Sequence, residues 1–568
     1  MLPPRLCHLD RGRKWVTRSE RNPHEIKPSR GRRTFHQTHR GPSRQQRGAV
    51  LIVITVVILL ASLTGYGLLA MVQAEHKAAR ASAYQAQNAA IVHSGCEYLA
   101  SLLERPQIEL TALGGLRHNP ELFQDVAFGT SGEIGDDRVG GFTLLGPPQI
   151  SPGQEEIPRI GVENESAKLH LGQLLLWDEQ QSGSAHLALM QLPGMTDQIA
   201  DAILDWIDDD DTPRPVGAES DYYRGLESPR VPRNGLPDQL EELLLVRDVT
   251  REMLFGQDRD QNYLPDQELL DTYQKSTSHQ ETSKVVRHSP AAGPFPPWSR
   301  YLTIYSAERN EMPNGQPRIH VNQLDLGQLH ETLLQVFPVE WADFIVAYRQ
   351  LGPASDSTSA RGQQYQVDLA IPPQHDLKSP LELIDATVST TDKAGKRLDL
   401  ESPFSTDSTS LANDLPHLLD AISVDDTDTI SGRVNIAEAP REVLAAVPGI
   451  DEGLVEQILA DRSLQSMEDN RHDVTWLLTD GRVDLERMTK LLPNITVGGD
   501  VVRVQIVAFV DEAPPAHRVE TVIDASVRPA CRRYYRDLRM LGRGFPEQFV
   551  RGDSRKDGLT SNFPTTGW

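Results

Sequence analysis

The sequence predicts an α+β protein with a long N-terminal transmembrane helix, a small antiparallel sheet, and a large α-helical domain inserted into that sheet. Three observations predict this fold. An uncharged, largely apolar run of 24 residues extends from Ala49 to Val72. A unit of short strand, helix, tight turn and second helix occurs three times between residues 167 and 462, which we interpret as an internal repeat. The segment VVRVQIVAFV (501–510) alternates at period two, as a half-buried strand does.

The N-terminal helix follows a basic leader. Residues 1–48 contain 13 Lys/Arg and 3 Asp/Glu in a chain of net charge -23, so the remaining chain is strongly acidic. At about 1.5 Å per residue the apolar run covers the hydrocarbon core of a bilayer. No signal-peptide cleavage site of small residues is evident after Val72. We therefore expect a single span, with the leader cytoplasmic and the acidic body exported. The Ala-rich continuation has no Pro or Gly before Gly95, which favours one continuous helix.

The exported body begins with short strands, of which GFTLLGPPQI (141–150) is the clearest. The three copies of the helical unit lie at 167–208, 318–349 and 433–462. Pro193-Gly194 and Pro448-Gly449 form the turns of the outer copies, and Phe337-Pro338 replaces them in the middle copy. After the third copy, VETVIDASV (519–527) is expected to return antiparallel to residues 501–510 across the loop EAPPAHR. This hairpin is expected to pack against the N-terminal helix.

The helical hairpins raise the question of nucleic-acid binding. In DNA-binding hairpins a second Gly follows the first after two residues and lets backbone N–H groups reach a phosphate. Gly194-Met195-Thr196 and Gly449-Ile450-Asp451 lack that second Gly, and the body is acidic. We therefore interpret the hairpins as packing modules and expect no nucleic-acid partner.

Two acidic loops are candidate calcium sites. In DWIDDDDTPRPVGAESDYY (205–223), four consecutive carboxylates end a helix, and two more follow a Pro-rich turn. Hard oxygen ligands on both sides of a turn suit calcium, and the flanking aromatic residues indicate partial burial, which unpaired carboxylates resist. The alternative is a solvated acidic loop. The predicted ligands are Asp208, Asp209, Asp210, Asp211, Glu219 and Asp221.

The second loop, DRDQNYLPDQE (258–268), begins like an EF-hand but has Tyr263 where that motif needs Gly. It is either a degenerate calcium site or a polar linker. The candidate ligands are Asp258, Asp260, Asn262 and Asp266.

The junction at Arg47-Gly48-Ala49 resembles that of type IV prepilins and pseudopilins. The resemblance implies that a prepilin peptidase cuts between Gly48 and Ala49, and that the mature helix packs with other subunits into a fibre. Major pilins carry Glu at the fifth mature position, where this chain has Val53. That departure favours the family's special tip member over a repeating subunit.

Further stretches are similar to the family of type II secretion protein K, the large minor pseudopilins. They are LPGMTDQIADAILDWIDDDD with GAESDYY, LEELLLVRDVT (240–250) and GRVNIAEAPREVLAAVPGI. The resemblance implies a pilin-type helix, a pseudopilin sheet with an inserted domain of helix-hairpin-helix (SAM-like) repeats, and calcium in the acidic loop. It also implies a position at the pseudopilus tip beside other minor and major pseudopilins, in contact with the inner-membrane secretion machinery. Ser220 stands where the family more often has an acid.

These interpretations divide the chain into nine segments. They are a leader (1–48), a transmembrane segment (49–72), the remaining helix and first strands (73–165), a first helical module (166–256), a linker (257–300), a second module (301–378), a third (379–470), C-terminal strands (471–545) and a tail (546–568). Cys96 and Cys531 either pair in an oxidising compartment or remain thiols.

No nucleotide-binding loop, HExxH motif, nucleophile elbow or Cys/His ligand cluster occurs in the sequence, so we expect no enzyme. The function predicted is a minor pseudopilin at the tip of the type II secretion pseudopilus, which initiates or caps the fibre. It would be a single-pass protein of the inner membrane with a periplasmic body. The alternative is a membrane-anchored DNA-uptake receptor with hairpin modules, which would bind duplex DNA at low salt.

The leader junction generates a direct prediction. Gly48→Ala leaves the apolar span intact, but it should slow cleavage and leave a longer species on a gel. N-terminal sequencing of the wild-type protein should begin at Ala49. An intact leader on the mature protein would contradict the pseudopilin interpretation and leave a plain membrane anchor.

Overall fold

The structure is a computed structural model that describes residues 46–129, 140–148, 158–264, 266, 296–354, 367–391, 397–464, 473–510 and 513–552. Most of the predicted leader (1–45), much of the predicted linker (267–295) and most of the predicted tail (553–568) lie outside the described residues. The chain divides into two compact units, residues 1–78 and 79–568.

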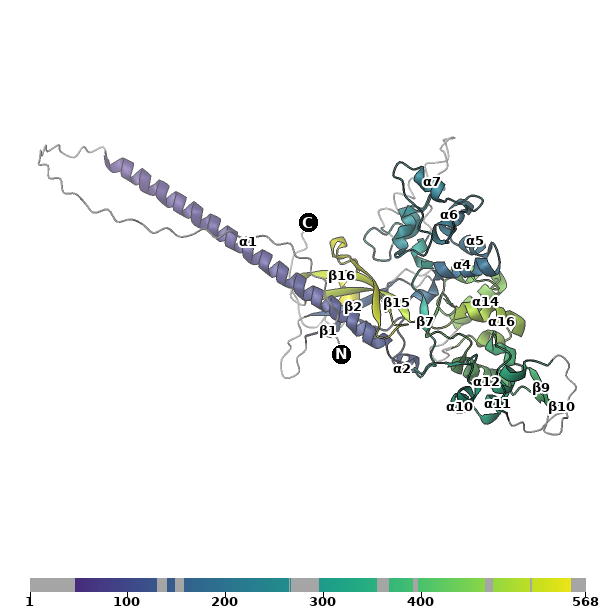
Figure 1. The fold of residues 1–568 in the computed structure, drawn as a ribbon. Coiled ribbons are helices and arrows are strands. Elements are labelled where there is room, and N and C mark those ends of the chain that lie inside the picture. Colours follow the sequence, from purple (N-terminus) through teal and green to yellow (C-terminus); the bar gives the residue numbers. More distant parts are fainter. Residues whose placement is uncertain are drawn as a thin grey trace, which may run out of the picture. The chain divides into compact units, whose positions relative to one another are not determined.

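The first unit contains the start of helix α1, which runs from Gln46 to Leu103 (Figure 1). The segment Val50–Leu103 is long and apolar enough to cross a membrane, with a mean hydropathy of 2.4 over its most apolar part. The apolar side chains between Val50 and Val72 are exposed. An apolar surface of this length is unfavourable in water and favourable in hydrocarbon. The predicted long, apolar N-terminal helix is confirmed.

The second unit contains a seven-stranded antiparallel sheet in the order β1-β2-β15-β16-β17, with β3 paired to β2 and β4 paired to β15. Its strands are β1 (Val126–Phe128), β2 (Gly140–Gly146), β3 (Arg159–Ile160), β4 (Glu163–Asn164), β15 (Val501–Val510), β16 (Ala513–Asp524) and β17 (Cys531–Asp537). Strands from both ends of the body therefore form one sheet. The chain between residues 165 and 500 is inserted into it, and the combination of helices with antiparallel strands agrees with the predicted α+β class (Figure 1).

The C-terminal part of α1 packs on this sheet. Ile91 and Leu99 are fully buried in one core with Leu144 of β2 and Ile506 of β15. A Cβ atom at Gly95 would lie 3.0 Å from the Ile506 side chain. Gly95 therefore lets the helix approach the strand closely, and it does not interrupt the helix.

The return strand differs from the predicted hairpin. Strand β16 begins at Ala513, so residues 513–518, which were predicted as loop, belong to the strand. The register pairs Ala508 with His517 and Val510 with Ala513, with an irregularity between the two pairs. A bulge of this kind tolerates Pro514 and Pro515, which have no N–H to donate to a regular ladder. The two prolines thus mark an irregular strand end.

The three copies of the helical unit share one order of elements. The first comprises β5 (Leu169–His170), α4 (Leu171–Gln180), α5 (Ser184–Leu189), α6 (Asp197–Ile207) and β6 (Leu302–Thr303). The second comprises β8 (Ile319–His320), α10 (Leu326–Leu333), α11 (Val339–Leu351) and β11 (Ile422–Ser423). The third comprises β13 (Val434–Asn435), α13 (Arg441–Ala446), α14 (Glu452–Leu464) and β14 (Ile495–Thr496). In each copy the first strand pairs in parallel with the last, which the sequence reasoning did not predict.

At the last strand the three copies have the sequences Leu-Thr-Ile (302–304), Ile-Ser-Val (422–424) and Ile-Thr-Val (495–497). The central Thr or Ser of each forms the hydrogen bonds that fix the end of the copy. Thr303 donates to Glu165, and Thr496 donates to Glu308 Oε2 at 2.6 Å. Ser423 accepts from Asn310 Nδ2 at 3.1 Å. Each hydroxyl also accepts the backbone N–H two residues further on. This three-residue pattern was the available signal for the closing strands.

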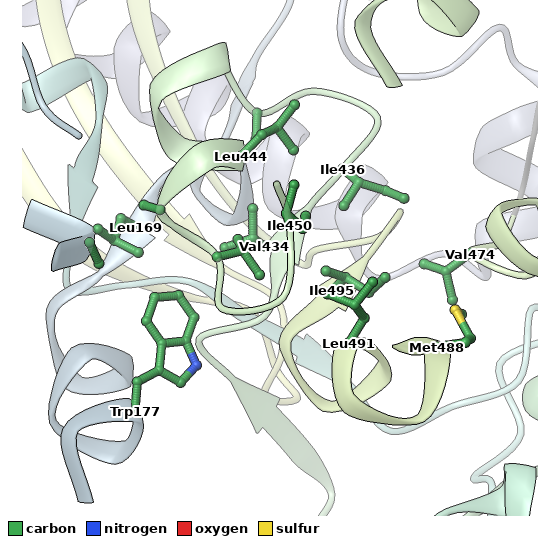
Figure 2. Close-up of a cluster of buried hydrophobic side chains, with 14 of the residues drawn as sticks. Leu169, Trp177, Val434, Ile436, Leu444, Ile450, Val474, Met488, Leu491 and Ile495 are labelled. Carbon is green, nitrogen blue, oxygen red and sulfur yellow. The ribbon is translucent and has the colours of Figure 1, made fainter. Parts of the chain in front are cut away.

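The copies share one hydrophobic core, as the close-up of Figure 2 shows for part of it. Trp177 of the first copy is buried with Val434 and Ile495 of the third. Trp177 Nε1 also donates to Asn494 Oδ1 at 2.7 Å. The copies are therefore parts of one inserted domain that bury their apolar faces against one another.

The remaining short elements connect these parts. They are α2 (Gln107–Ala112), α3 (Pro120–Phe123), η1 (Glu165–Ala167), α7 (Ser220–Arg224), η2 (Leu240–Leu245), α8 (Arg251–Phe255), η4 (Trp298–Arg300), β7 (Ala307–Arg309), η5 (Pro380–Leu383), β9 (Thr387–Thr391), β10 (Arg397–Glu401), α12 (Ser408–Ala421), β12 (Thr429–Ser431), α15 (Trp476–Thr479), α16 (Leu485–Leu491), η6 (Leu492–Asn494), η7 (Arg539–Leu541) and α17 (Glu547–Arg551). Cys96 and Cys531 are free thiols in the structure.

One buried carboxylate joins the sheet to the inserted domain. Glu165 is fully buried, and it accepts hydrogen bonds from Arg503 Nε of β15 at 2.7 Å and from Lys168 Nζ at 3.0 Å. The Thr303 hydroxyl of β6 donates to its other oxygen. Burial alone would raise the pKa of the Glu165 carboxyl, but the charges of Arg503 and Lys168 outweigh burial and lower this pKa to about 2. The ionised group is therefore held by three separate segments.

This carboxylate predicts an acid sensitivity. The pKa of Glu165 is lowered on folding from 4.5 to about 2, so its stabilising contribution is complete above pH 4.5 and is lost as the pH falls through about 2. Glu165→Gln removes the nearest carboxylate from Arg503, while Lys168 keeps Glu163 at 2.7 Å, so the substitution should cost about 3 kcal/mol of unfolding free energy at pH 7. Urea unfolding of the full-length protein in detergent between pH 7 and pH 2 measures the unfolding free energies of wild type and Glu165→Gln. The difference between the two values should disappear as the pH falls to about 2.

The matched control is Glu486→Gln, which removes an exposed pair with Lys490. Its effect on the unfolding free energy should be too small to resolve in the same measurement, because solvent screens the exposed pair. Equal stability of wild type and Glu165→Gln at pH 7 would contradict the anchoring role of Glu165.

Candidate metal centre

The predicted acidic loop begins where helix α6 ends (α6 and α7 in Figure 1). Thr196 caps the start of α6, and every residue from Ile199 to Ile207 is buried. Asp208 has an extended backbone and ends the helix. The carboxylates from Asp208 onward thus lie at the negative end of the helix dipole, where they need positive partners.

Aromatic packing returns the chain to the end of α6. Tyr223 of α7 is fully buried, and its ring lies edge-on to that of Trp206, with 5.0 Å between centroids. The Tyr223 hydroxyl accepts the Arg247 N–H at 3.2 Å, and the Arg247 guanidinium donates to the Gly217 carbonyl. These contacts position Glu219, the residue before α7, beside the acidic end of α6.

Asp208, Asp210 and Glu219 form a group that could hold a metal ion. One oxygen from each lies within 4.8 Å of the other two. Both oxygens of Glu219 and Oδ1 of Asp208 are buried and have no hydrogen-bond partner among the described residues. Buried carboxylate oxygens without donors are costly, and a cation between them would remove that cost.

The pKa of the Glu219 carboxyl reflects the same unfavourable burial of negative charge. Burial, then the charges of Asp205 and Asp208, and then the hydrogen-bonding contact and charge of the neighbouring Asp211 carboxyl, raise the pKa of the Glu219 carboxyl to about 8. An acid with a raised pKa in the folded state destabilises the metal-free protein as the pH rises from about 4.5 to 8. A bound divalent cation would favour the ionised carboxylate and reverse this effect.

Arg214 is the site residue that sequence reasoning missed. Its guanidinium donates to Asp178 at 3.3 Å, to Asp205 at 3.1 Å and, through Nη1, to Asp208 Oδ2. Asp205 is fully buried and also accepts the Arg214 backbone N–H. The available signal was that Arg214 is the only basic residue in the segment 205–223, where it stands between two prolines.

The turn of the loop depends on a glycine. A Cβ atom at Gly217 would lie 1.9 Å from Asp205 Oδ2, so no larger residue fits there without displacing this carboxylate. The neighbouring Val216 N–H donates to Asp201 Oδ2 at 3.2 Å, and His186 Nδ1 lies 2.7 Å from Asp201 Oδ1. The loop is thereby held against α6 through Asp201, which also contacts His186 of α5.

Three other predicted ligands are not brought into the group. The Asp221 side chain is fully exposed and lies 4.0 Å from Arg224. Asp209 is exposed. Asp211 is exposed as well, and its Oδ1 accepts the Ser220 N–H at 3.3 Å. Asp211 therefore supports the start of α7 and adds negative charge beside Glu219.

The second predicted loop is closed by its own hydrogen bonds. The two oxygens of Asp258 accept the N–H groups of Asn262 and Tyr263 at 3.1 and 2.7 Å. Asn262 Nδ2 donates to Asp260 Oδ2, and Asp266 Oδ2 accepts the Arg259 N–H. Burial raises the pKa of Asp258 to about 7. Among the described residues, this loop holds no group of three acidic, His or Cys ligands.

The acidic loop lies within the part of the chain that matches a protein-family model. Residues 173–255 match the family model described as type II secretion system (T2SS), protein K. This match confirms, over those residues, the resemblance predicted from the sequence. No curated protein matches the chain.

One solved structure aligns with the chain at low similarity. It is the crystal structure of the GspK-GspI-GspJ complex from the enterotoxigenic Escherichia coli type 2 secretion system. The alignment has 12% sequence identity, covers 80% of this chain and 97% of the other, and has a TM-score of 0.27.

Proposed function

Because residues 173–255 belong to the type II secretion protein K family, we propose that this protein is a minor pseudopilin of a type II secretion pseudopilus. This family match is the observation that carries the proposal. The exposed apolar part of α1 suits both membrane insertion and packing against the helices of other subunits. The protein is then a structural part of a secretion machine, held in the inner membrane with its body in the periplasm.

The finer role that we propose is at the fibre tip, where the protein initiates or caps assembly. Val53 occupies the fifth mature position if cleavage follows Gly48, so no carboxylate is present to neutralise the N-terminal amine of a neighbouring subunit. The inserted domain, which we propose to consist of helix-hairpin-helix (SAM-like) modules, adds bulk that a repeating position in a fibre would not accommodate. Its partners are other minor and major pseudopilins, the prepilin peptidase and the inner-membrane secretion machinery.

The tip role predicts where the protein lies in assembled fibres. Immunogold labelling with an antibody against the inserted domain should mark fibre ends only. A labelled major pseudopilin in the same preparation serves as the control and should mark the whole length. Gold particles from this protein distributed along the fibres would contradict the tip role.

We also propose that the acidic loop binds calcium. Asp208, Asp210 and Glu219 would hold the ion, because their oxygens converge and three of them have no donor in the described chain. Calcium accepts six to eight hard oxygen ligands, so carbonyl oxygens and water would complete its shell. The bound ion would supply positive charge that converts carboxylate repulsion into coordination.

The calcium site predicts a metal-dependent stability. Calcium at a hundredfold excess over its dissociation constant should stabilise the full-length protein by about 2.7 kcal/mol, so chelator should lower its Tm. Glu219→Gln and Asp208→Asn should each remove most of this difference, because they remove ligand charge. Asp221→Asn is the matched control, and it should leave the difference unchanged because Asp221 is fully exposed. An unchanged Tm on chelation of protein that contains measured calcium would contradict the proposal.

A further inference from the structure

The acidic loop contains its own cation, and this cation contacts one of the carboxylates that converge on the candidate metal position. Arg214 Nη1 donates to Asp208 Oδ2, while Asp208 Oδ1 is the buried oxygen without a partner. The two oxygens of a single carboxylate therefore face two different positive partners. One partner is the guanidinium, and the other is the ion proposed above.

The position of Arg214 is built into the fold. Its backbone N–H donates to Asp205 at 3.2 Å, and its guanidinium donates to the same carboxylate at 3.1 Å. Pro213 and Pro215 flank it, and a following proline restricts the backbone to extended conformations. The Arg214 side chain is 22% exposed, whereas Asp205 is fully buried. Arg214 is thus an ordered, largely buried part of the loop.

The charge of Arg214 has two opposite effects on a bound ion. It holds Asp178, Asp205 and Asp208 together when no metal is present, which favours a preformed loop. It also repels a divalent cation and withdraws electron density from Asp208. The first effect makes calcium binding tighter, and the second makes it weaker.

The structure indicates which effect dominates. The other two converging side chains, those of Asp210 and Glu219, form no ion pair with Arg214, and Glu219 is positioned by α7 and by the packing of Tyr223 on Trp206. The loop turn is fixed independently by the bond from the Val216 N–H to Asp201. Loss of the guanidinium therefore leaves the positions of Asp210 and Glu219 supported, while it removes a positive charge at Asp208.

We propose that Arg214 is a counter-cation that substitutes for calcium in the metal-free loop and lowers the affinity of the loop for the ion. This inference rests on the calcium site proposed above. The loop would then exchange one cation for another, and it would remain folded at calcium concentrations that leave the site empty. Arg214 would set the calcium concentration at which loading occurs.

The test is a calcium titration of the full-length protein in detergent by isothermal calorimetry, with the Tm measured in chelator and in calcium. Arg214→Gln should bind calcium at least about tenfold more tightly than wild type, equivalent to about 1.4 kcal/mol. It should also melt lower than wild type in chelator. Arg214→Lys keeps the charge and should restore an affinity close to that of wild type.

Arg233→Gln is the matched control. Arg233 pairs with Asp238 and Glu242, which lie outside the acidic loop, so its loss should leave calcium affinity unchanged. Weaker or unchanged calcium binding by Arg214→Gln, with wild type binding the ion, would overturn the inference and leave Arg214 a purely structural residue.

Two further outcomes separate this inference from the calcium proposal itself. If neither wild type nor Arg214→Gln binds calcium, the calcium site fails and the inference fails with it. If only Arg214→Gln binds, the counter-cation role is supported and the wild-type protein is not a calcium protein. An Arg214→Gln protein that folds only in calcium would overturn the inference, since Arg214 would then be required to preform the loop.

Discussion

The ionised carboxylate of Glu165 is the constraint on which the arrangement of sheet and inserted domain depends. A buried charge is tolerated only when its partners are all in place. Here the partners are Arg503 from the C-terminal part of the sheet, Lys168 from the entry to the first copy and Thr303 from its last strand. The exit and re-entry of the inserted chain are therefore coupled to the sheet at one point. Between Lys168 and Thr303 the chain meets the sheet again, because the carbonyl oxygen of Gln261 accepts hydrogen bonds from Gln505 of β15 and Arg518 of β16.

Each of the three copies is held together by the same two kinds of polar contact. These shared contacts explain why three divergent sequences keep one architecture. A hydroxyl at the end of each copy meets a buried polar side chain, and a histidine or arginine on the first hairpin helix faces a carboxylate on the second. These interhelical pairs are His186 with Asp201, His330 with Asp343, and Arg441 with Glu452. The hairpin turns can differ because the pairs act across them. In the turns of the first and third copies, Gly194 and Gly449 adopt left-handed backbone conformations. In the middle copy, Phe337-Pro338 stands at the corresponding turn.

Sequence reasoning identified the elements that carry strong local patterns. These are the apolar helix α1, the paired helices of each copy, and the strands β2 and β15. It predicted a short strand at YLTIYS (301–306), which contains β6, but not the parallel pairing of the first and last strands of each copy, because pairing over two residues leaves almost no periodicity and depends on contacts distant in sequence. At the site it selected Asp208, Asp210 and Glu219 by composition, but composition cannot distinguish them from the exposed Asp221. Their position in the fold decides that difference, since the oxygens of Asp208, the exposed Asp210 and the buried Glu219 converge, whereas the Asp221 side chain does not join them. In the second loop, which begins like a calcium motif, both oxygens of Asp258 instead accept the backbone N–H groups of Asn262 and Tyr263.

The three copies differ in the charge of the residues at the C-terminal end of the second hairpin helix, and this difference explains why the acidic group lies in the first copy. In the second copy Arg349 is fully buried and donates to the carbonyl oxygens of Val321 and Gln323. In the third, Arg462 donates to the carbonyl oxygens of Ala439 and Ile436. Both arginines bring positive charge to the negative end of their helix. At the corresponding end of α6 the chain has Ile207 followed by four aspartates, so the dipole and the side chains carry the same sign. One arginine from the following loop offsets only part of that charge. The second and third copies thus carry a cation at this helix end within the chain, whereas in the first copy three carboxylate oxygens of Asp208 and Glu219 lack a donor among the described residues, which is the basis of the proposed metal site.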